Sequence, residues 1–145
     1  MSASTRRTFL AVAALALLAP ALAAAEVPAA IRVIKGSRQG PARLDPKLDD
    51  LRRQLSPLAY VRWEQVRFEK LDFKRGKTEF VELPGGDTVG LTLEELRGDV
   101  VTFEVSLTSR NTQSRLTVEK GQRIVHQVTP EKGGEAIFVT VQAWP

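Results

Sequence analysis

One histidine is the only side chain in this sequence with an ordinary pKa close to neutral pH. His126 lies between Val125 and Gln127, in a stretch where apolar and polar residues alternate. An imidazole can act as a general base, but a hydrolase also needs a nucleophile or a second acid placed near it. No serine or aspartate is assigned to His126 by its spacing. We therefore predict a protein that is not an enzyme, and a hydrolase built on His126 ranks third among the alternatives.

Metal and cofactor sites are not expected either. One histidine and no cysteine leave none of the ligand spacings typical of zinc or calcium sites. Gly85-Gly86-Asp87 does not fit a phosphate-binding loop, which has a longer glycine pattern and opens a helix. Asp49-Asp50 and Glu94-Glu95 are adjacent carboxylates on solvent-facing stretches, not a matched acid and base. We predict no catalytic residue, no metal and no cofactor.

Aromatic and basic side chains are better candidates for a binding surface. Tyr60, Trp63 and Phe68 lie close together on a predicted strand and could stack on a sugar or a peptide. Aromatic residues on an alternating strand are more often part of the core. Trp144, next to the C-terminal residue, could hold the last strand or meet a partner. The candidate ligand or partner surface comprises Tyr60, Trp63, Trp144, Arg52 and Arg53.

The charge of the chain is unevenly distributed. The whole sequence has 21 basic and 17 acidic residues, and residues 1–25 contain two of the basic ones, so 19 − 17 leaves +2 for the remainder. This small net charge predicts no nucleic-acid partner. Residues 32–77 hold 13 basic and 6 acidic residues, whereas residues 78–145 hold 6 and 10. Two halves that neutralise each other are favoured over a basic face for a polyanion.

The first 25 residues have the order of an export signal. Two arginines precede an apolar, alanine-rich run, and Ala23-Ala24-Ala25 offers a cleavage site. Pro20 interrupts the run, which is shorter than the roughly 20 residues of a spanning helix. Cleavage is therefore favoured over a retained anchor. We predict a signal over residues 1–25 and a single exported domain over 26–145, periplasmic or secreted and without a membrane span.

The signal also carries a resemblance. Thr5-Arg6-Arg7-Thr8-Phe9-Leu10 resembles the twin-arginine export motif, although Ala11 stands where a lysine often follows. The resemblance implies export of an already folded protein from a bacterial cytoplasm. The general secretory route is the alternative, because paired arginines occur in its signals too. The absence of cysteine excludes a lipid-modified signal and a disulfide framework.

One short helix is predicted near the start of the exported part. Asp45 can cap free backbone amide groups, and Pro46 suits the first helical position. Leu48, Leu51 and Leu55 follow at helical spacing. This apolar stripe is expected to cover an open end or an edge of the sheets.

Most of the remaining chain alternates with a period of two, which is typical of half-buried strands. The clearest stretch is 78–107, where Pro84–Asp87 and Arg97–Asp99 predict hairpin turns. A bulge is expected near Gln65, and Ile31–Ile34 is expected to be an edge strand. The inward rows are Val101, Phe103, Val105 and Leu107, and then Ile137, Val139, Val141 and Ala143. We predict a mainly all-β fold, an antiparallel β-sandwich of about seven to eight strands with one short N-terminal amphipathic helix.

The order of these features over residues 44–143 resembles small exported β-rich proteins of bacteria that have no known activity. An amphipathic helix, a strand with Tyr60, the run Leu83–Asp87, paired strand rows and an apolar last strand carry the resemblance. It implies a periplasmic β-sandwich without an activity.

The function predicted from the sequence is protein binding. The export signal and the missing catalytic set favour a non-enzymatic accessory protein of a bacterial envelope assembly. Its contact with a protein partner is expected at a strand edge, either Ile31–Ile34 or the last strand. The alternative is a periplasmic module that binds a glycan or an anionic polymer.

Overall fold

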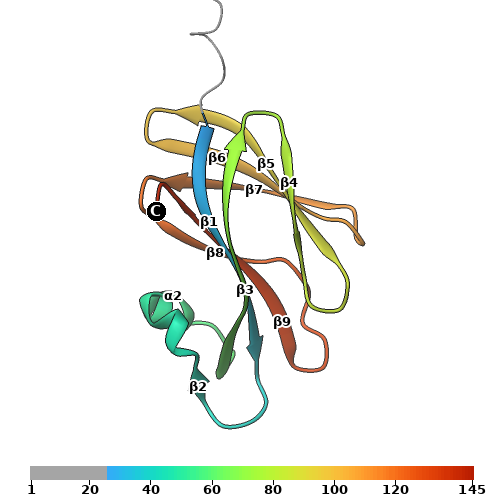
Figure 1. The fold of residues 1–145 in the computed structure, drawn as a ribbon. Helices are drawn as coiled ribbons and strands as arrows, with labels where there is room; N and C mark the ends of the chain where they lie inside the picture. The colour runs from blue at the N-terminus through green and yellow to red at the C-terminus, as the bar shows by residue number, and fades with distance from the viewer. Residues whose placement is uncertain (1–25) are drawn as a thin grey trace, which may run out of the picture.

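A computed structural model describes residues 26–145 as two β-sheets and one short helical segment (Figure 1). The predicted export signal, residues 1–25, lies outside the described residues. Sheet A has the strand order β2-β3-β1-β9-β8, and sheet B has the order β4-β5-β6-β7. All strand pairs are antiparallel except β2 with β3. The prediction of a mainly β fold with one short helix is confirmed.

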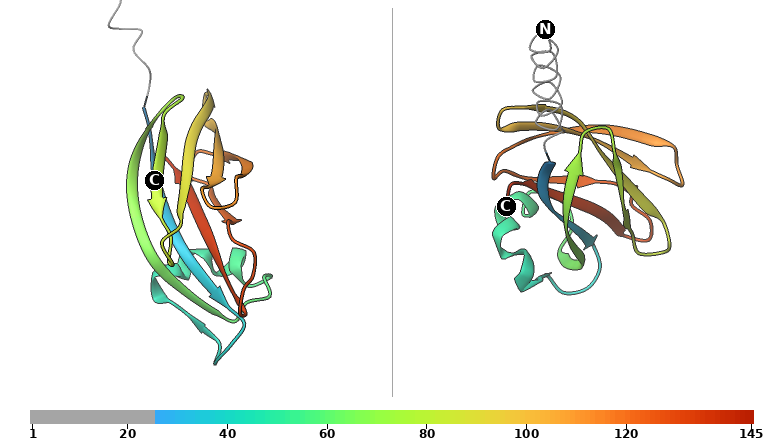
Figure 2. Two further views of the ribbon diagram at one scale, coloured as in Figure 1. Left: turned by 90° about the vertical axis from the view of Figure 1, so that its right-hand side faces the viewer. Right: turned by 45° about the horizontal axis from the view of Figure 1, so that its top comes forward.

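The strands alternate with short connections along the chain. Sheet A consists of β1 (Glu26–Ser37), β2 (Arg43–Leu44), β3 (Arg62–Lys74), β8 (Arg123–Gln127) and β9 (Glu135–Ala143). Sheet B consists of β4 (Thr78–Glu82), β5 (Thr88–Arg97), β6 (Val100–Leu107) and β7 (Thr112–Glu119). The helical segment is the 3-10 helix η2 (Pro46–Leu51) followed by α2 (Arg52–Leu55). Figure 2 shows that sheet A is curled, with β3 bent along its length.

The main core lies between the inner faces of the two sheets. Both predicted inward rows, on β6 and on β9, are buried there. Phe73 of sheet A and Phe103 of sheet B meet edge-to-face with ring centroids 5.0 Å apart. The period-two alternation therefore identified the buried faces correctly.

The predicted turns and the predicted bulge are confirmed. Pro84–Asp87 connects β4 to β5, and Gly85 and Gly86 both have positive φ angles that favour glycine. Arg97–Asp99 connects β5 to β6 through Gly98, which has a φ of 57°. The register between β1 and β3 shifts at Val33/Ile34, which leaves Val66 without a partner.

The helical segment covers the outer face of sheet A, not an end or an edge. Its three leucines are fully buried in a second apolar cluster, whose other buried members come from sheet A. Arg32 on β1 donates to Asp50 from Nη1 at 2.9 Å and from Nη2 at 2.5 Å. This pair holds the helical segment to the sheet. The second cluster consists of Ile34, Leu48, Leu51, Leu55, Trp63, Ala136 and Phe138.

The two strands predicted as edges lie inside sheet A, so that prediction is wrong. β1, which contains Ile31–Ile34, pairs with β3 on one side and β9 on the other. The last strand, β9, lies between β1 and β8. The reason is burial on both faces: Val33 faces sheet B, while Ile34 faces the helical segment. The free edges belong instead to β4, β7, β8 and most of β3.

Within residues 26–145, no helix has both the length and the apolar character needed to cross a membrane.

Candidate functional site

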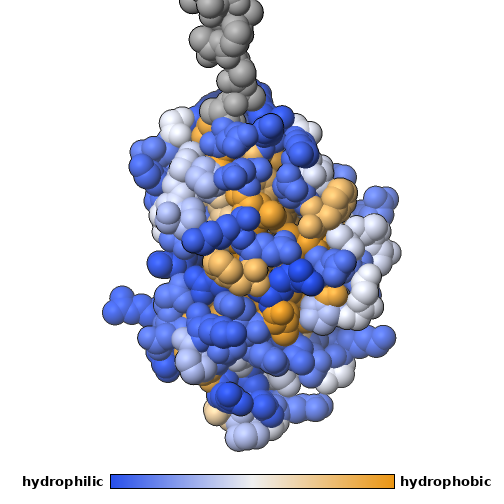
Figure 3. All heavy atoms as spheres, viewed as in Figure 1, coloured by the Kyte–Doolittle hydropathy of each residue, from blue (hydrophilic) through white to orange (hydrophobic). Residues whose placement is uncertain are grey.

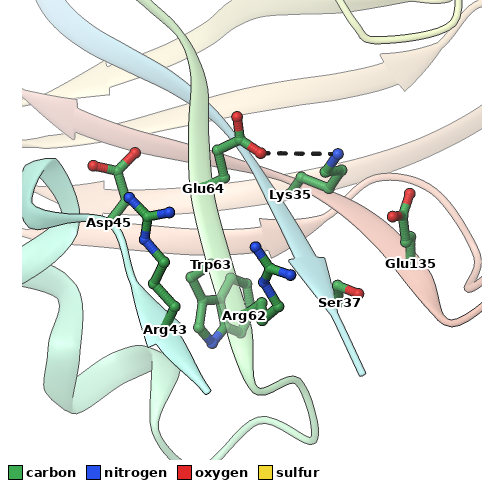
Figure 4. A pocket seen from close by; sticks show the side chains of 8 residues that line it. All are labelled: Lys35, Ser37, Arg43, Asp45, Arg62, Trp63, Glu64 and Glu135. Carbon is green, nitrogen blue, oxygen red and sulfur yellow. Dashed lines mark ion pairs between the residues drawn. The ribbon is translucent and has the colours of Figure 1, made fainter. Parts of the chain in front are cut away.

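A polar groove lies where β1, β2, β3 and β9 come together at one end of sheet A (Figure 4). Its volume is about 440 Å³. Charged side chains of both signs line it, beside one edge of a tryptophan ring. We call this cavity the polar groove; its lining consists of Lys35, Ser37, Arg43, Asp45, Arg62, Trp63, Glu64 and Glu135.

Two arginines stand directly opposite each other in this groove. Arg43 on β2 and Arg62 on β3 are register partners in the parallel pair, so their side chains leave the sheet on the same face. Neither guanidinium forms an ion pair or a hydrogen bond with any of residues 26–145. Like charges at directly opposite positions destabilise a sheet. The pair therefore needs an explanation other than the stability of the fold.

The carboxylates nearby are already engaged. The Asp45 side chain accepts the Lys47 N–H at 3.1 Å and the Gln65 N–H at 3.0 Å. These two hydrogen bonds hold the pKa of the Asp45 carboxyl below its usual range, and the one from Gln65 contributes more than the one from Lys47. Glu64 pairs with Lys35, with 3.8 Å between Oε2 and Nζ. The third carboxylate, Glu135, forms no ion pair or side-chain hydrogen bond with residues 26–145.

The loop after β1 fixes the position of Arg62. Gly40 in that loop has a φ of 84°, and a Cβ atom there would lie 2.7 Å from Nη1 of Arg62. The Arg62 side chain therefore lies directly against the Gly40 backbone. A larger residue at position 40 would displace the guanidinium from the groove.

A second cavity, of about 520 Å³, adjoins the polar groove, and both are lined by Lys35 and Glu135. It lies between the β4–β5 turn, the end of β6 and the connection from β8 to β9. We call it the apolar cavity after the apolar part of its wall, which consists of Leu83, Pro84, Leu107, Pro130, Ala136 and Ile137. Charged side chains also line it, namely Lys35, Asp87, Arg110, Lys132 and Glu135.

Three of the sequence-predicted surface residues come together in the structure. Tyr60, Trp63 and Arg52 line a hollow of about 320 Å³ beside α2. The ring of Trp63 is 6% exposed and meets Tyr60 and Phe138 edge-to-face, at centroid distances of 5.7 and 5.1 Å. Trp63 is thus part of the second cluster, and its ring has no open face for stacking on a sugar. Tyr60 is half-buried.

Tyr60 is also held by charged neighbours. The Arg38 guanidinium lies 5.0 Å from the centroid of the Tyr60 ring and pairs with Glu131. Burial, followed by the hydrogen bond to Glu131, raises the pKa of the Tyr60 hydroxyl. This contact joins the loop after β1 to the loop before β9 and so closes one side of the fold.

The other two predicted residues lie elsewhere. Trp144 packs against the main core. Its backbone N–H donates to the carbonyl of Pro28 at 2.8 Å, which ties the end of the last strand to the first strand. Arg53 is exposed on α2 and is not part of the hollow. The five residues therefore do not form one surface.

His126 has no catalytic neighbours. It lies half-buried on β8 opposite Val139, and its imidazole makes no hydrogen bond to residues 26–145. Burial lowers its pKa, and no charged group contributes to that shift. In this same range of residues, no group of three or more histidines or carboxylates is placed to hold a metal ion.

The two oppositely charged halves of the chain do meet. Four ion pairs join residues 32–77 to residues 78–145: Arg38–Glu131, Arg67–Glu82, Lys77–Glu79 and Asp50–Arg123. The neutralisation is incomplete at the polar groove, where Arg43 and Arg62 remain unpaired with described residues.

Three large apolar side chains are exposed on β3 and β4, and Figure 3 shows hydrophobic atoms among polar ones on the face of the molecule that it draws. They are Val66, Phe68 and Phe80, at 38%, 48% and 65% exposure. Phe80 covers the backbone of Gly90, since a Cβ at Gly90 would lie 3.3 Å from its ring. Arg67 crosses between the sheets here and pairs with Glu69 and Glu82.

The free edge of β7 is a further surface that the sequence did not indicate. Lys120 N–H donates to Asp99 O at 2.8 Å, on the side of β6. Backbone groups alternate in direction along a strand. The N–H and C=O groups of Gln113, Arg115 and Thr117 therefore point away from β6. We call these three residues the β7 edge.

This edge has fewer protections than the other free edges: Arg115 is the only charge within it, and Gln122 Oε1 caps only the outward N–H of Glu119, at 3.0 Å. β7 has eight residues in unbroken register with β6, without proline or a bulge. By contrast, β3 carries a bulge and a dense row of charges. The strands β4 and β8 are only five residues long. The side chain of Gln54 also donates to the Arg123 carbonyl of β8, at 2.5 Å. Half-buried apolar side chains flank the β7 edge at the rim of the main core: Leu116, Ile124 and Val128.

No protein-family model, no curated protein and no solved structure matches this chain. The function must therefore be argued from the surfaces themselves.

Proposed function

We propose that this protein is a non-enzymatic binding protein that accepts an extended segment of a partner protein along the β7 edge. The observation that carries the proposal is the long and regular edge of β7, on which the backbone groups of Gln113, Arg115 and Thr117 have no partner among residues 26–145. The partner strand extends sheet B from four strands to five by β-augmentation.

Backbone hydrogen bonds supply part of the affinity. Gln113, Arg115 and Thr117 are exposed and offer three N–H donors and three C=O acceptors in strand geometry. Each hydrogen bond made on binding contributes about 0.5–1.5 kcal/mol net. These groups are already ordered in the free protein, so the partner alone bears most of the ordering entropy.

Apolar contact supplies the remainder and defines the partner. The inner side of an added strand faces Leu116, Ile124 and Val128, which are incompletely covered. A partner with apolar residues at every second position covers them, since alternate side chains of a strand share a face. The preferred partner is therefore an extended segment with period-two alternation.

The compartment belongs to the proposal as well. The signal-like order of residues 1–25 supports export from a bacterial cell. The site of action is then the envelope, and the folded part is a two-sheet sandwich. N-terminal sequencing of the secreted or periplasmic form tests this part, and a form that retains residues 1–25 contradicts it.

The strand-edge proposal is tested with Thr117→Pro and Thr117→Ala. Proline removes one outward N–H from the β7 edge but no bond to β6, so the fold tolerates it. We expect wild type and Thr117→Ala to retain one defined partner from envelope extract in stoichiometric amount, and Thr117→Pro to retain about tenfold less or none. Circular dichroism checks that both variants are folded.

Equal retention by Thr117→Pro contradicts the edge as the contact. A wild-type protein that stays monomeric and recovers no stable partner contradicts the binding function itself.

A further inference from the structure

The polar groove goes beyond the proposed function, because it lies apart from the β7 edge and has its own chemistry. We propose that it binds a carboxylate of an extended acidic peptide between Arg43 and Arg62. An apolar side chain next to that carboxylate then occupies the apolar cavity.

The first argument is the arginine pair itself. Arg43 and Arg62 are register partners on adjacent strands, and both line one cavity of about 440 Å³ (Figure 4). Opposite positions on paired strands place Cβ atoms about 5 Å apart. Both side chains line the same cavity, so an anion placed there can contact both guanidinium groups.

The second argument is that none of the three carboxylates lining the groove, Asp45, Glu64 and Glu135, forms an ion pair with Arg43 or Arg62. Asp45 uses its two carboxylate oxygens on the N–H groups of Lys47 and Gln65. Glu64 is engaged by Lys35. Both guanidinium groups are therefore available to a ligand.

Guanidinium chemistry defines the ligand group. Arginine presents a planar fork of N–H donors that matches a carboxylate in a bidentate way, and it stays protonated at any physiological pH. Gly40 lets the chain pass close to Arg62, since a Cβ atom there would lie 2.7 Å from Nη1 of its guanidinium. The groove is suited to hold the carboxylate in a defined orientation.

The adjoining cavity favours a peptide over a polymer. Lys35 and Glu135 line both cavities, so a ligand seated in the polar groove continues into a space walled by Leu83, Leu107 and Ile137. A peptide is able to place an apolar side chain one or two residues from its carboxylate, whereas an anionic polysaccharide has no such side chain. Burial of one such side chain adds about 1.5–3 kcal/mol of hydrophobic stabilisation.

The test measures the binding of a fluorescein-labelled synthetic peptide in which Glu-Leu pairs are separated by proline, so that it cannot add as a strand to the β7 edge. The same peptide with glutamine in place of glutamate is measured beside it. We expect the acidic peptide to bind and the glutamine peptide to bind at least about tenfold more weakly. Arg43→Gln and Arg62→Gln should each weaken binding by about tenfold or more. Raising the salt concentration from roughly 0.05 to 0.5 M should weaken it further.

Arg53→Gln is the matched control, because it removes the same charge from an exposed site on α2 outside the groove. It should leave the affinity unchanged. Both groove variants should unfold at the same or higher denaturant concentration than wild type, since they relieve a like-charge pair. Thr117→Pro should bind the peptide as wild type does, which separates this site from the β7 edge.

Three results overturn the inference. The first is equal affinity for the acidic and glutamine peptides, and the second is wild-type affinity in both groove variants. The third is dextran sulfate that binds more tightly than the peptide and displaces it, which assigns the groove to an anionic polymer.

Discussion

The carboxylate of Asp45 accepts the backbone N–H of Gln65 at 3.0 Å, at the point where β2 ends and the register of β3 shifts. The backbone N–H of Asp45 donates to the carbonyl of Trp63 at 2.9 Å. The backbone and the side chain of Asp45 therefore form consecutive hydrogen bonds to β3. Its second oxygen caps the helical segment through the N–H of Lys47. One residue thus joins β2, the bulge of β3 and the start of η2.

Replacing Asp45 with alanine should lower the free energy of unfolding by about 1–2 kcal/mol, because a helix cap is lost and the Gln65 N–H loses its acceptor. Urea denaturation measures the change. Asp49→Ala is the control on the same segment, since Asp49 is 72% exposed and pairs only with Arg52. It should change stability by no more than about 0.5 kcal/mol. Equal effects of the two substitutions would contradict the dual role of Asp45.

The same carboxylate predicts a pH dependence. Hydrogen bonds hold its pKa below the ordinary value, so its ionised form stabilises the fold above the unfolded pKa of about 3.9. This contribution is lost as the pH falls through the lower folded pKa. The stability difference between wild type and Asp45→Asn should therefore be present at neutral pH and shrink steadily below about pH 4. A difference that stays constant over this range would be inconsistent with an ionised cap.

Gly36→Ala should destabilise the fold by about 1–3 kcal/mol through overpacking. A Cβ atom at this position would lie 2.9 Å from Cζ3 of Trp63 and 3.0 Å from Cγ of Tyr60, and both rings belong to rigid surroundings. Thermal or urea unfolding gives the size of the effect. Combining Gly36→Ala with Trp63→Phe should cost less than the sum of the two single changes, because the smaller ring makes room. Simple additivity would show that the clash lies elsewhere.

Asp50→Ala should cost about 1–3 kcal/mol, which is more than Glu64→Ala costs. The Arg32 side chain is 11% exposed, so removal of Asp50 leaves a mostly buried guanidinium without its partner. The hydrogen bond from Arg32 is the main reason that the pKa of Asp50 lies below its usual range. Arg123 adds to this effect, with its Nε 2.8 Å from Oδ2 of Asp50. Glu64 is 63% exposed in a pair of 3.8 Å and is the control. Matching losses in the two variants would contradict the role of Arg32 in holding the helix.

His126 should make the protein less stable in mild acid. Burial lowers its pKa in the folded state, so the unfolded chain binds a proton first as the pH falls below about 6.5. Stability should decline from that pH down to the folded pKa of His126. His126→Gln should remove this part of the decline, as measured by urea unfolding at several pH values. An unchanged profile would mean that the imidazole is not buried as a neutral group.

The helix start, the turns and the inward rows were predictable because each depends on neighbouring residues. A capping aspartate followed by proline, glycines at positive φ, and period-two alternation over β6 act within a few residues. The candidate sites were less predictable. Tyr60 and Trp63 were picked out by residue type, but Trp63 serves the cluster under the helix. Arg43 and Arg62, 19 positions apart, carry no local pattern that pairs them.

By itself, the sequence determined which stretches form strands, where they turn and which face each strand buries. Only the tertiary structure decided which strands are neighbours. The backbone N–H and C=O groups are the same in every strand, so they do not determine which strand pairs with which. The pairing of β1 with β9, from opposite ends of the chain, makes both strands interior and leaves β7 open. The parallel contact of β2 with β3 likewise places two arginines face to face. Both candidate binding surfaces arise from such long-range pairing, which depends on the burial of the whole core.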